Sequence, residues 1–245
     1  MENQSTLIDS ASVLIIRDNQ KTGGLEVLMG KRHQDINFAG GAYVFPGGKL
    51  DQNDLAVGFQ NSSFPIGYNQ VIGTAFREVF EESGIVIGSS EGAAAFRQEL
   101  ISQKIDLAEF IKKARVTFNV DDLVPFARWV TPKIYTKRFD TRFFLAKMPI
   151  NQSATPDQQE IVDAVWVKPI DFIEKFKETM MYPTLMNLKL LGRSRSVEEA
   201  ITHARNRKIV TVEPKIINGV RVVDPAAGYE EIDQNYIHQG VKKTD

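Results

Sequence analysis

Three glutamates crowd one face of a short segment in the first half of the chain. Residues 77–85 read Arg-Glu-Val-Phe-Glu-Glu-Ser-Gly-Ile, so Glu78, Glu81 and Glu82 stand at positions i, i+3 and i+4 and share one side of a helix. Like charges at this spacing destabilise a helix by about 0.2–0.5 kcal/mol per pair, and the helix dipole disfavours anions in the last turn. A divalent cation would reverse both effects. These nine residues predict a metal site, with a solvated helix face as the alternative.

The segment around these glutamates has the pattern of an amphipathic helix. Apolar residues at 72, 75, 76, 79 and 80 recur at three- and four-residue spacing between about residues 71 and 83, and Gly84 suits a left-handed C-cap. Elsewhere, β-rich runs predict strands at residues 12–17, 25–31, 43–45, 123–130, 141–148 and 164–167. Helices are predicted at residues 92–114 with a break near Asp106, and at 169–181, 185–191 and 197–206.

This order of strands and helices predicts the α/β class, as a sandwich with a mixed β-sheet. The main domain is expected over residues 1–181, and residues 182–245 are expected to form a C-terminal helical extension. The tail of this extension is too apolar to be freely solvated, so it is expected to pack on the core or on a partner subunit, which makes a homodimer an open possibility. Its apolar residues are Val210, Val212, Ile216, Ile217, Val220, Val222 and Val223.

Composition narrows the chemistry that the chain can perform. The 245 residues carry a formal net charge of -1, from 30 basic and 31 acidic residues, which provides no overall field for nucleic acid or an anionic membrane. There is no cysteine and there are three scattered histidines, so thiol nucleophiles and zinc sites are excluded while a hard cation with oxygen ligands is not. No apolar run approaches the roughly 20 residues that span a bilayer. We expect a cytoplasmic protein.

A second motif lies upstream of the glutamates. Phe45-Pro46-Gly47-Gly48 is followed by Asp54, six residues after Gly48. The two pieces together resemble the Nudix box, Gly-x5-Glu-x7-Arg-Glu-U-x-Glu-Glu-x-Gly-U, in which U is aliphatic. The box then covers residues 48–85, with Asp54 in place of Glu and residues 55–69 as an insertion. The resemblance spans about residues 7–179 and implies a Nudix hydrolase with an α/β/α sandwich.

The resemblance also implies roles for the box residues. Glu78, Glu81 and Glu82 become ligands of Mg²⁺ or Mn²⁺, with the carbonyl of Gly47 as a further ligand. Arg77 is expected to anchor the cluster by bonding Glu81 one turn along the helix. Nudix enzymes draw the general base either from the box or from a later loop. Glu160 is the loop candidate, and an ordinary exposed glutamate is the alternative reading of this residue.

The segment before the box indicates a branch of the family. Its Leu28, Arg32, Gly41 and residues 45–48 match the signature of the coenzyme A diphosphatases, whereas Gly30, His33 and Asn37 depart from it. The interrupted box resembles the same branch. Coenzyme A or acyl-coenzyme A is therefore the first expected substrate, and ADP-ribose, a dinucleoside polyphosphate or a non-catalytic nucleotide-binding module are the alternatives. Arg32, Arg138 and Arg142 are expected substrate contacts, because guanidinium groups match phosphate oxygens. Phe45 is a further expected substrate contact.

Overall fold

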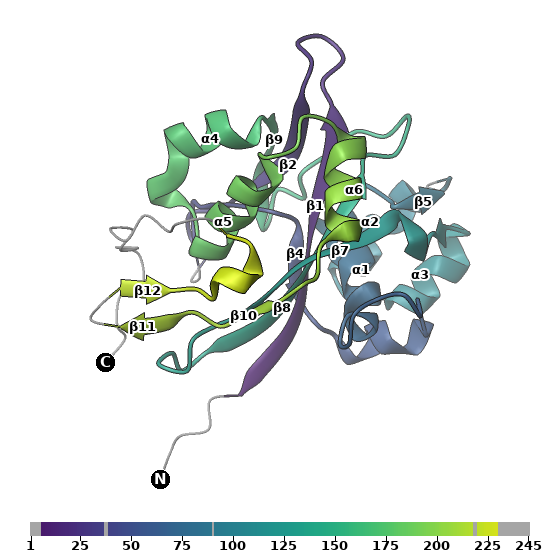
Figure 1. The fold of residues 1–245 in the computed structure, drawn as a ribbon. Coiled ribbons are helices and arrows are strands. Elements are labelled where there is room, and N and C mark those ends of the chain that lie inside the picture. Colours follow the sequence, from purple (N-terminus) through teal and green to yellow (C-terminus); the bar gives the residue numbers. More distant parts are fainter. Residues whose placement is uncertain (1–5, 37–38, 90, 218–219, 230–245) are drawn as a thin grey trace.

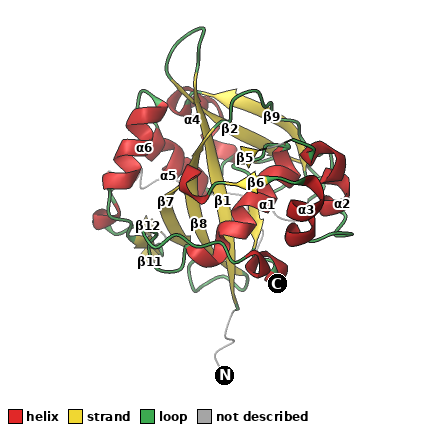
Figure 2. Cartoon of the chain, turned by 90° about the vertical axis from the view of Figure 1, so that its right-hand side faces the viewer, coloured by secondary structure: helices red, strands yellow, loops and turns green. Residues whose placement is uncertain are grey.

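A mixed sheet lies between two groups of helices (Figure 1; Figure 2). The computed structural model of the chain describes residues 6–36, 39–89, 91–217 and 220–229. The helices are α1 (Ile72–Ser83), α2 (Arg97–Ile101), α3 (Leu107–Ala114), α4 (Pro169–Phe176), α5 (Tyr182–Leu191) and α6 (Val197–Asn206). Helix α1 packs on one face of the sheet, with α2 and α3 on its outer side, and α4, α5 and α6 pack on the other face. The α/β sandwich predicted from the sequence is confirmed.

The sheet runs in the order β10-β7-β8-β1-β2-β3, while β4 pairs with β1 and β9 pairs with β2. The two longest strands, β1 and β8, run parallel along the middle of the sheet, and β1 forms an antiparallel pair with β2. The strands are β1 (Leu7–Asp18), β2 (Leu25–Arg32), β3 (Tyr43–Val44), β4 (Gly47–Lys49), β7 (Leu123–Val130), β8 (Arg138–Lys147), β9 (Ile161–Val167) and β10 (Thr211–Val212).

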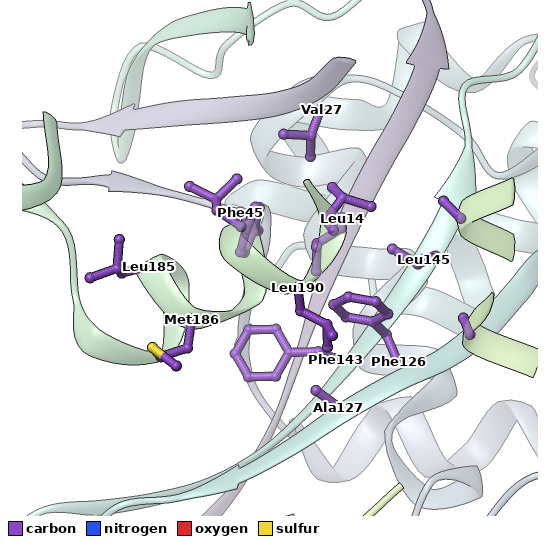
Figure 3. Packing of buried hydrophobic residues seen from close by; sticks show 14 of the residues in the cluster. Leu14, Val27, Phe45, Phe126, Ala127, Phe143, Leu145, Leu185, Met186 and Leu190 are labelled. Atoms are coloured by element: carbon purple, nitrogen blue, oxygen red, sulfur yellow. The ribbon is translucent and has the colours of Figure 1, made fainter. Parts of the chain in front are cut away.

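Both faces of the central strands are covered, which explains the unbroken apolar run in β1. Successive side chains of a strand point to opposite faces, so Leu14 and Ile16 join the core beneath α4, α5 and α6, while Val13 and Ile15 join the core beneath α1. Figure 3 shows Leu14 in the first of these cores, together with Phe143 of β8. A strand buried on both faces reads as a continuous hydrophobic run.

Strand β1 has two different partners along one edge. Residues Ile16–Asp18 pair with β2, whereas Ser10–Ser12 pair with β4, and between them the N–H of Val13 donates to the carbonyl of Pro46 at 2.8 Å. Our prediction ended the strand at Pro46-Gly47-Gly48, but Gly47–Lys49 continue in the sheet as β4. Because a Cβ on Gly47 would overlap the backbone of β1, glycine is required there.

The helix boundaries follow local capping chemistry. Helix α1 ends at Gly84, whose φ of 71° is left-handed, and the predicted break near Asp106 is an N-cap in which the side chain accepts from the N–H of Glu109 at 2.8 Å. The helix predicted over 169–181 divides into α4 and a 3-10 turn at Lys177–Thr179 before α5 begins. None of the helices in the described part is long and apolar enough to cross a membrane.

The C-terminal extension packs against the main sheet through α5, α6 and its tail. Val212 and Val223 are buried, as expected, whereas Ile216 and Ile217 of the hairpin β11 (Lys215–Ile217) and β12 (Val220–Val222) are exposed in this single chain. The hairpin is therefore not covered by the core of its own chain, and its packing on a partner subunit stays a prediction. The side chain of Val220 and residues 230–245 lie outside the described residues, and the domain boundary at residue 181 stays a prediction.

A buried hydrogen-bond chain joins the tail to the core. The hydroxyl of Tyr229 accepts from the indole N–H of Trp129 at 3.0 Å and donates to the side-chain oxygen of Asn187 at 2.8 Å. Burial raises the pKa of Tyr229 to about 12. A phenol whose folded-state pKa is raised keeps its full contribution to stability below the unfolded pKa of about 10, and loses it as pH rises through the folded pKa.

We therefore predict that the Tyr229→Phe variant is less stable than wild type at pH 8 but loses less stability between pH 9 and pH 11. The difference in pH dependence should be about 1 kcal/mol at pH 11. Urea titrations monitored by tryptophan fluorescence would measure it. Parallel losses in both proteins would show that the Tyr229 hydroxyl does not resist ionisation.

Candidate active site

Arg77 is the centre of the box cluster. Its Nε and Nη2 donate to the two carboxylate oxygens of Asp54 at 2.9 and 3.0 Å, and its Nη1 donates to Glu78 at 2.8 Å and to Glu81 at 3.0 Å. The last contact is the one expected from the i, i+4 spacing. Although burial opposes the charge, Glu78, Asp54 and Glu81 raise the pKa of Arg77. A permanent cation thus holds three acidic side chains.

Asp54 positions the arginine. Its side chain is 1% exposed, and it also accepts from the hydroxyl of Thr74 at 2.8 Å and from the N–H of Asp51 at 3.2 Å. Glycine at position 73 allows this approach, because a Cβ there would overlap the backbone carbonyl of Asp54. Despite the shorter side chain and the insertion after it, Asp54 therefore sits inside the cluster, and in this arrangement it supports Arg77.

The box glutamates are largely shielded from water. Glu82 is 4% exposed, its Oε2 accepts from the N–H of Gly47 at 3.1 Å, and its Oε1 is buried with no hydrogen-bond partner in the part of the chain that the structure describes. Burial, followed by the charge of Glu78, raises the pKa of Glu82 well above its usual value. Burial likewise raises the pKa of Glu78, and that of Glu81 to about 7, against the lowering effect of Arg77.

The backbone of strand β4 lies against the box glutamates. A Cβ on Gly48 would overlap the carboxylate of Glu78, so a larger residue would force the end of the Glu78 side chain to move. The contact observed for Gly47 is its N–H donating to Glu82, while the proposed role of its carbonyl as a metal ligand stays a prediction. The β1 edge and the α1 face thus meet at Gly47 and Gly48.

Glu160 lies opposite the box, beside Arg32. Its Oε1 is 2.6 Å from Nη1 of Arg32, and its carbonyl accepts from the N–H of His33 at 2.8 Å. The charge of Glu160 raises the pKa of both Glu78 and Glu82, after burial. Glu160 and Arg32 therefore lie close enough to the box for their charges to act on its glutamates.

Two other expected substrate contacts are already paired. Arg138 donates to the carbonyl of Thr131 at 2.9 Å and to Glu213 at 2.9 Å. Arg142 is 3% exposed and forms ion pairs with Asp9 and Asp140. Protein groups take up donors of both side chains, although Nε of Arg142 is buried with no partner among the described residues. Their role as substrate contacts stays a prediction.

Phe45 is engaged within the protein as well, and its role as a substrate contact stays a prediction. Its ring is 3% exposed and packs edge-on against Phe143 at 6.4 Å. Figure 3 shows Phe45 within the hydrophobic core, where an apolar strand residue gains most from burial. Phe45 supports the site by fixing the start of the glycine turn. Asn37, where the signature sequence has arginine, lies outside the described residues.

Arg97 and Gln152 were not recognised from the sequence. Arg97 bonds the carbonyls of Glu81 and Thr155, and the side-chain amide of Gln152 pairs with both backbone groups of Val86 at 2.8 and 2.9 Å. Both tie the loop that carries Glu160 to the end of α1. They match no motif, because the partners are backbone groups distant in sequence.

The residues present suit a divalent cation, although the described side chains include no group of three acids or histidines that could hold an ion as they stand. Arg77 takes up Glu78 and Glu81, so those two carboxylates would have to turn from it toward an ion. The buried Oε1 of Glu82, which has no partner among the described residues, fits a cation, since a buried carboxylate oxygen otherwise needs a hydrogen-bond donor.

A groove of about 680 Å³ opens elsewhere, between the box insertion, the start of β7 and the end of α6. Arg205, Arg207 and Lys208 line it, but none of the box carboxylates does. Basic side chains complement the negative end of a helix dipole, and Arg207 is engaged with the carbonyls of Phe126 and Ala227. The groove is therefore not the site of the box chemistry.

Comparisons with known proteins agree with this geometry. The family model of the NUDT19 Nudix domain matches residues 60–188, more than half of the chain. A Caenorhabditis elegans protein, named provisionally as nudix hydrolase 7, is 26% identical over 89% of this chain and 73% of its own length. The acyl-coenzyme A diphosphatase NUDT19 of Xenopus laevis is 23% identical over 77% of this chain and 65% of its own length, so the chain spans just under two thirds of that relative. The fold is similar to a crystallised NUDIX hydrolase from Alicyclobacillus acidocaldarius, with a TM-score of 0.71, 24% identity and coverage of 81% of this chain and 97% of the other.

Asp54→Ala should destabilise the protein by about 3–5 kcal/mol, because it leaves the buried guanidinium of Arg77 without its main partner. Asp122→Ala, which removes an exposed aspartate, is the control and should change stability by less than about 0.5 kcal/mol. Chemical denaturation measures both. Equal stabilities for the two variants would contradict the role of Asp54 as the anchor of Arg77.

Proposed function

Since this chain belongs to the NUDT19 Nudix-domain family of Nudix hydrolases, we propose that it cleaves the diphosphate bond of a nucleotide derivative with Mg²⁺ or Mn²⁺. Glu78, Glu81 and Glu82 would hold the cation. The observation that carries this proposal is the buried Oε1 of Glu82, which has no partner among the described residues, next to the glycine backbone of β4. Negative charge concentrated in a shielded place favours a cation.

The bound cation would neutralise charge on the phosphate oxygens and lower the pKa of the attacking water. The chain's own residues do the rest. Arg77 and Asp54 keep the carboxylates of α1 in place, and Arg77 takes up their charge when no cation is bound. Glycines at 47 and 48 bring main chain to the cluster without side-chain bulk.

We propose that Glu160 takes the proton of the attacking water and that Arg32 contacts a phosphate oxygen. Arg32 suits this role because its side chain is 14% exposed and its Nε is buried with no partner in the described part of the chain. A guanidinium has donors for two partners at once, so Arg32 can hold Glu160 and a phosphate together. Glu160 is thereby kept beside the reacting phosphorus.

Coenzyme A or an acyl-coenzyme A is the substrate that we propose. The match of Leu28, Arg32, Gly41 and residues 45–48 to the coenzyme A diphosphatase signature supports it, as does the similarity to the acyl-coenzyme A diphosphatase of Xenopus laevis. Hydrolysis would give 3′,5′-ADP and a phosphopantetheine or its acyl derivative. A cytoplasmic location and a homodimer remain predictions from the sequence.

Incubation of the protein with coenzyme A, acetyl-coenzyme A, ADP-ribose and a dinucleoside polyphosphate tests the substrate. We expect 3′,5′-ADP from the first two when Mg²⁺ or Mn²⁺ is present, and no product after EDTA is added. Chromatography of the nucleotide products gives the answer. Turnover of ADP-ribose alone would replace the proposed substrate, and turnover of none would contradict the proposed function.

Glu82→Gln should lower kcat for the turned-over substrate by about 100-fold or more, because it removes the negative charge that holds the cation. The fold should be kept, since the amide is isosteric and relieves a buried like charge. Glu174→Gln, on the exposed side of α4, is the control and should retain wild-type kcat. Steady-state kinetics and circular dichroism distinguish the variants, and unchanged activity of Glu82→Gln would remove it from the site.

A further inference from the structure

Arg97 joins the end of the box helix to the loop that carries Glu160. We propose that Arg97 is a positioning residue, which holds Glu160 at the correct distance from the carboxylates of α1. The inference rests on the proposed function of the site. It concerns a residue outside the box and outside the signature segment, contributed by α2, which lies on the outer side of α1.

The contacts of Arg97 are specific to the two elements. Its Nε and Nη2 donate to the carbonyl of Glu81 at 3.2 and 2.8 Å, and Nη2 also donates to the carbonyl of Thr155 at 2.7 Å. The last carbonyls of a helix have no partner within the helix, so Arg97 caps α1 next to two of the proposed ligands. Hydrogen bonds from a charged donor are stronger than neutral ones.

Gly84 lies beside this bridge. A Cβ at position 84 would lie 3.2 Å from Nη1 of Arg97, and the positive φ of Gly84 turns the chain away from the helix end. The N–H of Thr155 meanwhile donates to the carbonyl of Ser83 at 2.7 Å. The loop is thus fixed to the last turn of α1 by a direct backbone bond and by the guanidinium bridge.

The tie continues from Thr155 to Glu160. The side chain of Asp157 accepts from the N–H groups of Gln159 at 2.5 Å and Glu160 at 2.6 Å, which closes the turn just before Glu160. The charge of Asp157 also acts on Arg97, opposing the lowering of its pKa by burial. The backbone of Glu160 is therefore connected to α1 through the turn closed by Asp157 and through the two bonds of Thr155, to Ser83 and to Arg97.

Such a connection matters because a general base must lie within hydrogen-bond reach of the proton that it takes. A misplacement of about 1 Å can cost a factor of about 100 in rate. The side chain of Glu160 is 47% exposed, so the surrounding core does not fix it. The bonds of its loop and Arg32 must do so.

A double-mutant cycle tests the inference. Arg97→Ala should lower kcat by about 10- to 100-fold and leave KM within about 2-fold, whereas in a Glu160→Gln background it should lower kcat by no more than about 2-fold. If the losses of kcat in Arg97→Ala and Glu160→Gln multiply in the double mutant, the inference is overturned. A change in KM with no change in kcat would also overturn it. Arg97→Lys, which lacks the planar fork, should show a smaller loss in the same direction.

Arg207→Ala is the matched control, because Arg207 also bridges two carbonyls, those of Phe126 and Ala227, but far from the Glu160 loop in sequence. It should lower the midpoint of thermal unfolding while keeping kcat. An equal loss of kcat in Arg207→Ala and Arg97→Ala would assign the effect to general destabilisation and overturn the inference.

Amide hydrogen exchange of the metal-free protein gives a readout that does not depend on activity. The N–H groups of residues 159–161 should exchange faster in Arg97→Ala than in wild type and at the wild-type rate in Arg207→Ala. Unchanged exchange in Arg97→Ala would overturn the inference. Absence of turnover by wild type on every diphosphate would instead count against the proposed function, while the exchange result still reports on Arg97.

Discussion

The ion pair between Arg77 and Asp54 is the interaction on which the rest of the site depends. Three glutamates on one turn of α1 repel one another, and their burial raises the cost of their charges. Arg77 reduces this cost by bonding Glu78 and Glu81, and Asp54 keeps the guanidinium in place with both of its oxygens. Among the described residues, the one donor to Glu82 is the backbone N–H of Gly47. Arg77 thus offsets enough of the repulsion between the glutamates for α1 to stay folded. The negative charge that remains would still favour binding of a cation.

Strand β1 has two partners along one edge, and this pairing places backbone of β4 beside the glutamates of α1. One half of the edge pairs with β2 and the other half with β4, so the chain crosses the sheet at Pro46 and exposes Gly47 and Gly48 toward α1. A larger residue at Gly48 would meet Glu78. The catalytic proposal therefore has its structural basis in the sheet, while α1 supplies the charges. The loop before β9 places Glu160 near the glutamates of α1.

The expectations from the sequence succeeded where local chemistry decides the outcome. Periodicity predicted α1 and the side of it that carries the glutamates, and capping predicted its end at Gly84. Both signals depend on residues a few positions apart. They do not show how Phe45, Arg138 and Arg142 are placed. An arginine in a sequence looks the same whether it meets a phosphate or an aspartate from another strand, as Arg142 meets Asp9. Likewise, a phenylalanine before a glycine turn does not reveal which way its ring points.

The order of residues by itself determined the α/β class, the crowded glutamates and the resemblance to the Nudix box, because these are patterns within short stretches of chain. Only the tertiary structure decided that Asp54 reaches Arg77 despite the insertion after it, and that Arg97 meets Thr155. Both contacts join groups whose distance depends on how separate elements pack. Backbone carbonyls are identical at every position, so a contact made to one of them leaves no mark in the sequence.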